Sequence, residues 1–352
     1  MTKRRTRDPG ASVVIGKGEK MKITILGCGF GTALAVLWNK AGHEITAWSR
    51  NEAEVKDIMR CGEHKRLLPG VPVSNRIEFT SDMSCIKGAD ILVFAIPSPS
   101  VREVAKKAAA YTDKDTVILN VGKGFEEGTR KRLSQVINEE LPNNRVAVMA
   151  GPCHAEEVGR GIPTTVVMSS EYAGCAQLLQ DALQTSTFRI YENDDTAGCE
   201  TAAALKNPIA LSCGIIEGMK LGDNTTASLM TRGLAEMTRL GVALGAKWET
   251  FTGLAGVGDL IVTCTSTHSR NHRAGILIGE GMSAKEAVAN VGTVEGYNCC
   301  RIAYKAACDL EVSAPIITEL YKICYENEDP RQSLKQLMGR PQKHEKERYW
   351  NN

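Results

Sequence analysis

The fold of this chain is decided by the stretch from Lys22 to Ala35, which reads KITILGCGFGTALA. A run of apolar and β-branched residues leads into three alternating glycines, Gly27, Gly29 and Gly31, and helix-forming residues follow. Glycines between a buried strand and a helix let the backbone approach a pyrophosphate closely, and the helix N-terminus favours negative charge there. The stretch therefore predicts a dinucleotide site, with a purely structural turn as the alternative. The spacing is G-x-G-x-G instead of G-x-G-x-x-G, so Thr32 stands where the third glycine is expected.

Downstream of this stretch, β-branched runs alternate with helical patterns as far as about Tyr191, which predicts a parallel sheet joined by crossover helices. The clearest expected strands are residues 22–26, 44–48, 91–96, 116–120, 146–149 and 164–168. Beyond Tyr191 the strand signals vanish, and helical spacing covers residues 196–219, 223–244, 270–279, 295–310 and 315–325. The sequence predicts an α/β Rossmann-like N-terminal domain with a mostly parallel sheet, followed by an all-α C-terminal domain.

The length of the chain favours two domains, because 352 residues is long for one core. We place the dinucleotide-binding domain at residues 21–193 and a helical substrate domain at residues 194–340. Residues 1–20 are rich in Lys and Arg without a following apolar segment, which predicts a disordered basic extension and not a secretory signal. Met21 is then an alternative start residue. Residues 341–352 have the composition of a polar tail.

The composition narrows the class of function. The formal net charge of +2 gives no electrostatic argument for binding nucleic acid or a membrane surface, and no apolar run approaches the ~18 residues that span a bilayer. The twelve cysteines form no C-x-x-C pair, so we expect reduced thiols and no metal site. For the adjacent Cys299 and Cys300, core packing is the favoured interpretation. These features predict a cytoplasmic enzyme with a small-molecule substrate.

The end of the second expected strand bears on the choice of dinucleotide. An NAD site places an acid there to bind the ribose 2′-hydroxyl, and such an acid would repel a 2′-phosphate. Here Ser49 and Arg50 offer a hydroxyl and a permanent cation. The pair favours NADP, or tolerance of both dinucleotides, with a solvated loop charge as the alternative for Arg50.

Two further segments follow expected strands and so face the same crevice, because ligands bind outside the carboxyl ends of parallel strands. Lys123 lies between two glycines after the strand at 116–120. The segment Gly151-Pro152-Cys153-His154 follows the strand at 146–149. A surface lysine is the alternative for Lys123, and a structural role is the favoured interpretation of His154.

The helical half contains three polar segments of interest. Lys206 and Asn207 lie in an otherwise apolar helix, and a buried ammonium needs a partner, a ligand or a lowered pKa. Pro208 follows them and predicts a kink beside the lysine. A glycine-rich turn presents Asp259, and the segment 269–271, Ser-Arg-Asn, opens a helix with donors suited to an anion.

In their order along the chain, these segments resemble the soluble NAD(P)-dependent glycerol-3-phosphate dehydrogenases, from Met21 to about Leu337. The motifs that carry the resemblance are K-G-F-E at Lys123, G-P-x-x-A-x-E-V at Gly151, L-K-N at Lys206, the G-D-N block from Gly222, G-L-A-G-x-G-D-L at Gly253, S-R-N at Ser269 and V-E-G at Val294. The resemblance implies an oxidoreductase that interconverts dihydroxyacetone phosphate and glycerol 3-phosphate with NAD or NADP for phospholipid synthesis. It also implies a homodimer.

The resemblance assigns roles to individual residues. Lys206 is expected to be the general acid, Lys123 to polarise the carbonyl oxygen, and Asp259 to orient Lys206 or a substrate hydroxyl. The expected substrate-binding residues are Lys123, Gly151, Cys153, Lys206, Asn207, Asp259, Ser269, Arg270 and Asn271. The expected cofactor-binding residues are Gly27, Gly29, Phe30, Gly31, Arg50, Lys123, Ala155, Arg270, Thr293 and Glu295.

Three departures from the family pattern bear on activity. The glycine turn is one residue shorter, Cys153 replaces a usual serine, and Pro208 replaces a usual aliphatic residue. Together they leave open a nucleotide-binding or sensing protein with weak or no turnover. Another two-domain hydroxyacid reductase is the second alternative.

Overall fold

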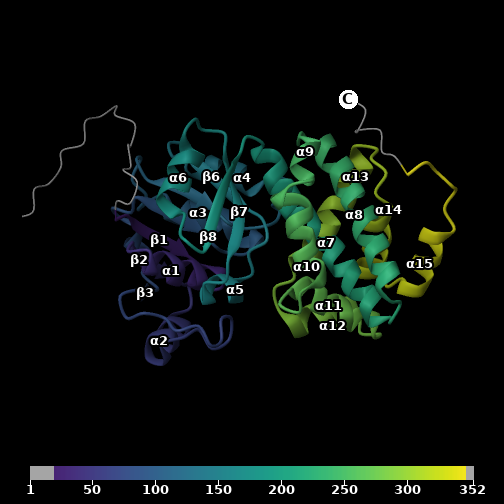
Figure 1. The fold of residues 1–352 in the computed structure, drawn as a ribbon, viewed down its shortest axis with the longest axis horizontal. Coiled ribbons are helices and arrows are strands. Elements are labelled where there is room, and N and C mark those ends of the chain that lie inside the picture. Colours follow the sequence, from purple (N-terminus) through teal and green to yellow (C-terminus); the bar gives the residue numbers. More distant parts are fainter. Residues whose placement is uncertain (1–19, 346–352) are drawn as a thin grey trace, which may run out of the picture.

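The computed structural model describes residues 20–345, which form two halves that lie side by side (Figure 1). The first half is a sheet covered by helices, and the second half is made of helices. The basic extension expected at residues 1–20 falls, except for Lys20, outside the described residues, as does the end of the expected polar tail. In the described part of the chain no helix has the length and apolar character needed to cross a membrane.

The sheet has eight strands in the order β3-β2-β1-β4-β5-β6-β7-β8, and all neighbours are parallel except β6 and β7. Strand β1 pairs with β2 on one side and with β4 on the other. The order of the strands therefore reverses here, and a crevice opens at the carboxyl ends of β1 and β4. The strands are β1 (Lys22–Leu26), β2 (Glu44–Trp48), β3 (Glu78–Thr80), β4 (Ile91–Phe94), β5 (Val117–Asn120), β6 (Val146–Ala150), β7 (Thr164–Ser170) and β8 (Phe188–Asn193).

Helices cover the sheet and bury its central strands. Strands β4 and β5 are buried along their whole length, as their apolar sequences require for a sheet covered on both faces. The helices of this half are α1 (Phe30–Lys40), α2 (Glu52–Cys61), α3 (Val101–Ala108), α4 (Leu133–Glu140), α5 (Ala155–Arg160) and α6 (Cys175–Leu183).

The second half is built around α7 (Thr196–Gly218), a helix buried on nearly every side. The other helices of this half are α8 (Asp223–Ala243), α9 (Trp248–Phe251), α10 (Asp259–Thr265), α11 (Arg270–Gly279), α12 (Ala284–Val291), α13 (Glu295–Asp309), α14 (Pro315–Tyr321) and α15 (Pro330–Met338). A π-helical turn at Leu254–Gly258 precedes α10.

Helices α7 and α11 touch through glycines. A Cβ atom on Gly214 would lie 2.0 Å from the carbonyl oxygen of His272, and one on Gly275 would lie 2.1 Å from that of Leu211. Larger side chains would force the two backbones apart. The glycines therefore bring α11 close to the C-terminal half of α7.

The expected fold class is confirmed, with local corrections. Two strands were missed: β3 has only three residues, and the polar, half-exposed β8 lacks a continuous apolar pattern. The expected helix at 315–325 is α14 followed by a π-helical segment, Lys322–Glu326. Helix α7 continues through Pro208 as far as Gly218.

The start of α7 is held to the start of α9 by the carboxylate of Asp195, which is 5% exposed. One oxygen accepts a hydrogen bond from the Gly198 amide at 2.8 Å and so caps α7. The other accepts from the Lys247 amide at 2.8 Å and the Thr250 hydroxyl at 2.6 Å, at the start of α9. We predict that Asp195→Ala lowers the free energy of unfolding by about 3 kcal/mol, because a cap is lost and buried donors are left unpaired.

Urea denaturation measures this effect, and Asp194→Ala is the matched control. The Asp194 carboxylate is exposed and pairs with the side chain of Lys247 at the surface, so its removal should leave the unfolding midpoint nearly unchanged. Equal effects of the two substitutions would contradict the capping role.

Candidate active site

The glycine turn has the geometry that a bound pyrophosphate needs. Gly27 has a φ of +107°, and a Cβ there would lie 2.4 Å from the carbonyl oxygen of Ala95. Gly29 stands at the N-cap of α1, which has no side-chain cap, so the first amides of the helix remain available to an anion. A Cβ on Gly31 would lie 2.8 Å from Ile25, so Gly31 allows the close packing of helix on strand that the third fingerprint glycine normally allows. The residues of the shortened turn therefore fit a dinucleotide.

The end of β2 has an acidic neighbour that the sequence analysis did not indicate. Arg50 is exposed, but the hydroxyl of Ser49 is buried and donates a hydrogen bond to Glu54 at 2.6 Å. Glu54 also contacts Arg66 at 3.0 Å. Its pKa is lowered to about 2, chiefly by a hydrogen bond from His64, so it is charged at neutral pH. An acid therefore lies beside this strand end, on α2, where sequence reasoning did not look for one.

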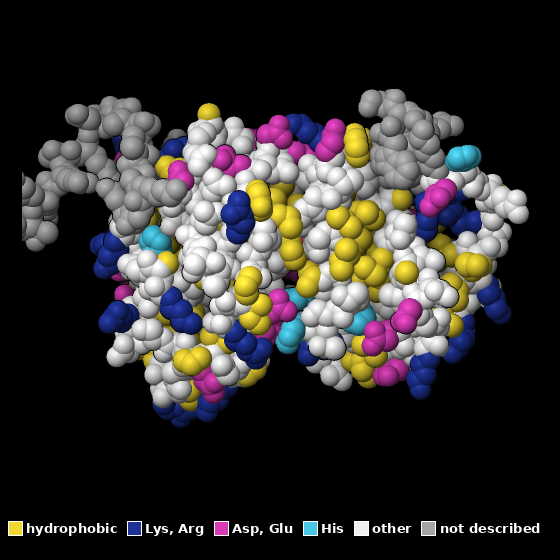
Figure 2. Space-filling view, viewed as in Figure 1, with side chains coloured by type: hydrophobic (Ala, Val, Ile, Leu, Met, Phe, Trp, Pro, Cys, Tyr) yellow, Lys and Arg dark blue, Asp and Glu magenta, His cyan; other side chains and the backbone are white. Residues whose placement is uncertain are grey.

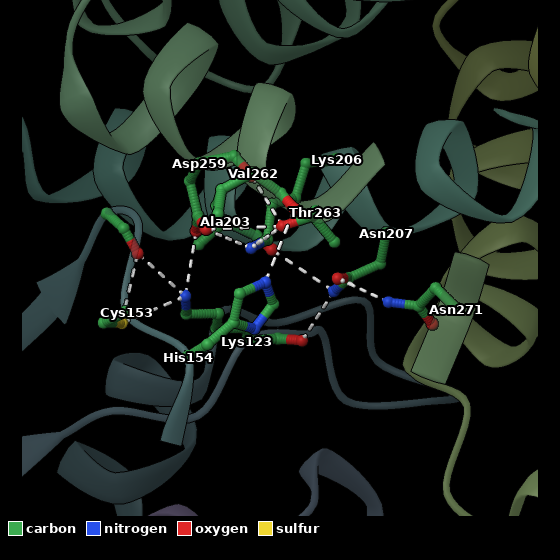
Figure 3. Close-up of polar contacts among 11 residues, drawn as sticks. Lys123, Cys153, His154, Ala203, Lys206, Asn207, Asp259, Val262, Thr263 and Asn271 are labelled. Atoms are coloured by element: carbon green, nitrogen blue, oxygen red, sulfur yellow. Dashed lines mark hydrogen bonds and ion pairs between the residues drawn. The ribbon is translucent and has the colours of Figure 1, made fainter. Parts of the chain in front are cut away.

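The centre of the candidate site is a buried carboxylate shared by two lysines (Figure 3). Asp259, at the start of α10, is 1% exposed. One carboxylate oxygen contacts the Nζ of Lys206 on α7, and the other accepts from the Nζ of Lys123 at 2.9 Å. Lys123 follows β5 in the sheet half, so the three residues join the two halves. Two cations and one anion leave a net positive charge at this point.

Burial and neighbouring charges shift the pKa values of the two lysines in opposite directions. Burial lowers the pKa of Lys206 to about 8, and the neighbouring charge of Lys123 adds to this effect against the opposing influence of Asp259. Burial also opposes the charge on Lys123, but the Asp259 carboxylate outweighs it and holds the pKa of Lys123 above its ordinary value. The two ammonium groups in turn hold the pKa of Asp259 below its ordinary value despite burial. Of these three groups, Lys206 therefore has the pKa nearest to neutral pH.

Thr263 completes the surroundings of Lys206 and was missed in the sequence. Its hydroxyl accepts from the Nζ of Lys206 at 2.8 Å and donates to the carbonyl oxygen of Asp259 at 2.5 Å. The sequence could have indicated Thr263, because it lies four residues after Asp259 and so on the same face of α10.

The two expected amide ligands, Asn207 and Asn271, form a chain of hydrogen bonds. Asn207 donates to the carbonyl oxygen of Lys123 at 3.2 Å, and Asn271 donates to the side-chain oxygen of Asn207 at 2.9 Å. The Asn271 oxygen in turn accepts from the Gly296 amide at 2.8 Å. The chain ties the starts of α11 and α13 to α7 and to the loop that carries Lys123.

Cys153 contacts Lys123. Its thiol donates to the carbonyl oxygen of Gly151 at 3.1 Å, and Lys123 contacts both this oxygen, at 3.0 Å, and the sulfur, at 3.4 Å. Burial raises the pKa of the thiol above its ordinary value, so Cys153 is neutral at pH 7. The thiol occupies the place of the usual serine and keeps a hydrogen bond to the backbone.

The remaining expected residues surround this centre less closely. Ser269 caps α11 by accepting from the His272 amide at 3.2 Å, and Arg270 is exposed on the first turn of that helix. Glu295 opens α13 and accepts from the amide and hydroxyl of Ser98 at 3.0 and 2.6 Å, which is a contact between the halves that the sequence did not indicate. Ala155 begins α5, and Thr293 is exposed before α13.

Histidine and acidic side chains gather at the surface where the two halves meet (Figure 2). The rings of His154 and His268, one from each half, lie 6.0 Å apart. The Nε2 atom of His154 is 3.4 Å from the carbonyl oxygen of Val262, and burial lowers the pKa of its ring. His154 is therefore neutral at pH 7 and packs across the boundary, in agreement with a structural role.

Comparison with known proteins identifies the family. Residues 22–176 match the family described as NAD-dependent glycerol-3-phosphate dehydrogenase N-terminus, and residues 195–335 match the corresponding C-terminus. A glycerol-3-phosphate dehydrogenase of Desulfitobacterium hafniense is 48% identical over 92% of this chain and 93% of its own length. One from Clostridium acetobutylicum is 47% identical over 92% of this chain and 98% of its own length.

A solved structure supports the same assignment. The glycerol-3-phosphate dehydrogenase of Coxiella burnetii is 35% identical, with a TM-score of 0.87, and the match covers 91% of this chain and 99% of that one. The chain belongs to the family of NAD(P)-dependent glycerol-3-phosphate dehydrogenases.

Proposed function

We propose that the protein interconverts dihydroxyacetone phosphate and sn-glycerol 3-phosphate with NAD(P)H and so supplies glycerol 3-phosphate for phospholipid synthesis. The observation that carries the proposal is the pair of lysines that share Asp259, one with a lowered pKa and one with a raised pKa. Residues 21–193 would bind the dinucleotide, and residues 194–340 would supply most of the substrate contacts. The homodimer and the cytoplasmic location stay predictions from the sequence.

The dinucleotide would bind the residues that the sequence indicated. The glycine turn and the start of α1 would hold the pyrophosphate, and Arg50 would lie beside the adenosine ribose. A bound nicotinamide supplies a hydride to C2 of the substrate in the reducing direction. The other assigned contacts are Phe30, Lys123, Ala155, Arg270, Thr293 and Glu295.

The side chains would manage the charge that develops on the carbonyl oxygen. Lys206 gives its proton to this oxygen and becomes a neutral amine, and in the reverse direction the amine takes the hydroxyl proton. Lys123 keeps its proton and stabilises the negative charge on the oxygen. Asp259 and Thr263 hold the Nζ of Lys206 in place. The substrate phosphate would bind Ser269, Arg270 and Asn271 at the start of α11.

Removal of Lys206 tests its role directly. We predict that Lys206→Met lowers kcat for dihydroxyacetone phosphate by about 10³-fold, because no group remains to protonate the oxygen. The dissociation constant for NADPH, measured by fluorescence titration, should change by less than about twofold, since a proton donor adds little to binding of the dinucleotide.

Lys285→Met is the control, because Lys285 is exposed on α12 in the same half. It should leave both constants unchanged. Loss of NADPH binding in Lys206→Met would mean that the lysine is structural. Tight binding without turnover in the unmodified protein would favour the alternative of a sensing protein.

The pKa of Lys206 predicts opposite pH profiles for the two directions. Reduction needs the ammonium form, so its kcat should fall as pH rises above the pKa of about 8. Oxidation needs the free amine, so its kcat should rise up to that pH and then level. Asp259→Asn should move both midpoints to lower pH, because the carboxylate raises the pKa of Lys206. Profiles with the same slope in both directions, measured between pH 6 and 10, would rule out Lys206 as the exchanging group.

Cofactor preference depends on the balance of Arg50 and Glu54 at the end of β2. We predict that Arg50→Asp raises KM for NADPH by about 10- to 100-fold and changes KM for NADH far less, since only NADPH carries a 2′-phosphate. Arg76→Asp makes the same change of charge before the start of β3, at the opposite end of the sheet, and should affect neither constant. Steady-state kinetics with both dinucleotides measures the effect, and an equal loss with both would remove Arg50 from the phosphate site.

A further inference from the structure

Pro208 leaves one carbonyl group of α7 without its helical partner. In an α-helix the amide of residue 208 donates to the carbonyl oxygen of Ala204, but proline has no amide hydrogen. Ala204 is fully buried, so water does not reach this oxygen freely. An unpaired buried carbonyl would weaken the helix two residues before Lys206.

The thiol of Cys299 takes the place of the missing amide. Its Sγ atom lies 3.3 Å from the carbonyl oxygen of Ala204 and is buried on α13. Burial raises the pKa of this thiol well above its ordinary value, so the S–H group is present as a donor at neutral pH. The contact joins a different helix to α7 at the site of the proline.

The start of α13 is held firmly against α7, so the thiol has a defined position. A Cβ on Gly296 would lie 2.5 Å from the carbonyl oxygen of Asn207, which shows how closely the two backbones approach. The amide of Gly296 donates to Asn271, which in turn donates to Asn207. Cys299 lies one helical turn beyond Gly296 and faces the same segment of α7.

We propose that Cys299 is a positioning residue for Lys206, because its thiol replaces the helix hydrogen bond that Pro208 removes. The inference rests on the proposed role of Lys206 as the acid. The backbone from Ala204 to Pro208 sets the direction of the Lys206 side chain, and displacement of a reacting group by about 1 Å costs up to about 10²-fold in rate. The thiol therefore acts on the reaction through the helix and without touching substrate.

The test compares two adjacent cysteines. Cys299→Ala should lower kcat about fivefold, as expected for loss of one hydrogen bond, with little change in KM for the dinucleotide. It should also shift the midpoint of the kcat pH profile, because the Nζ of Lys206 moves relative to Asp259. Cys299→Ser keeps a donor and should retain most of the activity.

Cys300→Ala is the matched control. Cys300 is also buried on the same helix, but its sulfur contacts the carbonyl oxygen of Ile317 in α14 and not a backbone carbonyl of α7. This variant removes the same thiol and should lower the melting temperature by a similar amount while kcat and the pH midpoint stay unchanged.

A double-mutant cycle with Pro208→Val completes the test. Valine restores an amide that can donate to Ala204, so Cys299→Ala in that background should change kcat by less than about twofold. An effect of the same size with proline or valine at 208, or equal loss of kcat in the Cys299 and Cys300 variants, would overturn the proposal. These outcomes are distinct from failure of the proposed role of Lys206, which would show as turnover in Lys206→Met.

Discussion

The structure depends on one buried carboxylate that holds two ammonium groups from different halves of the molecule. Removing three charges from water is costly unless they lie close together and their remaining hydrogen-bonding capacity is satisfied. Asp259 provides the shared partner, and Thr263 and the carbonyl oxygen of Gly151 satisfy the lysines further. Because one carboxylate cannot neutralise both cations, burial lowers the pKa of Lys206 below its ordinary value. The burial that accompanies this contact between the two halves thus lowers the pKa of one of its two lysines to about 8.

Such a cluster requires backbones that approach closely, and the helical half achieves this with small residues. Glycines on α7 and α11 let the two helices touch, and Gly296 lets α13 approach α7. The side-chain amides of Asn207 and Asn271 then link these elements to the loop of Lys123. The polar groups of the site are therefore positioned by rigid helices and strand ends, and few of them depend on a mobile loop.

Much of the fold could be predicted because its signals are local. A buried strand followed by glycines and a helix is visible in one short stretch, and the apolar run at 91–96 indicates a central strand. The short β3 and the reversed pairing of β6 and β7 depend on tertiary contacts that no local pattern encodes. Within the site, Lys206 could be singled out from the sequence, because a lysine in an otherwise apolar helix must have a partner, a ligand or a lowered pKa. Glu54 and Ser98 could not be singled out in this way, because the side chains that they contact, Ser49 and Glu295, lie outside their own elements.

At each of the three departures from the family pattern, the structure shows a local contact that suits the residue present. Gly31 packs against β1 as the missing third glycine would, and Cys153 donates to the backbone from the position of the usual serine. At Pro208, a thiol from another helix meets the carbonyl that the proline leaves unpaired. At each of the three departures the local backbone is therefore packed or hydrogen-bonded, and Lys123 and Lys206 both contact the carboxylate of Asp259.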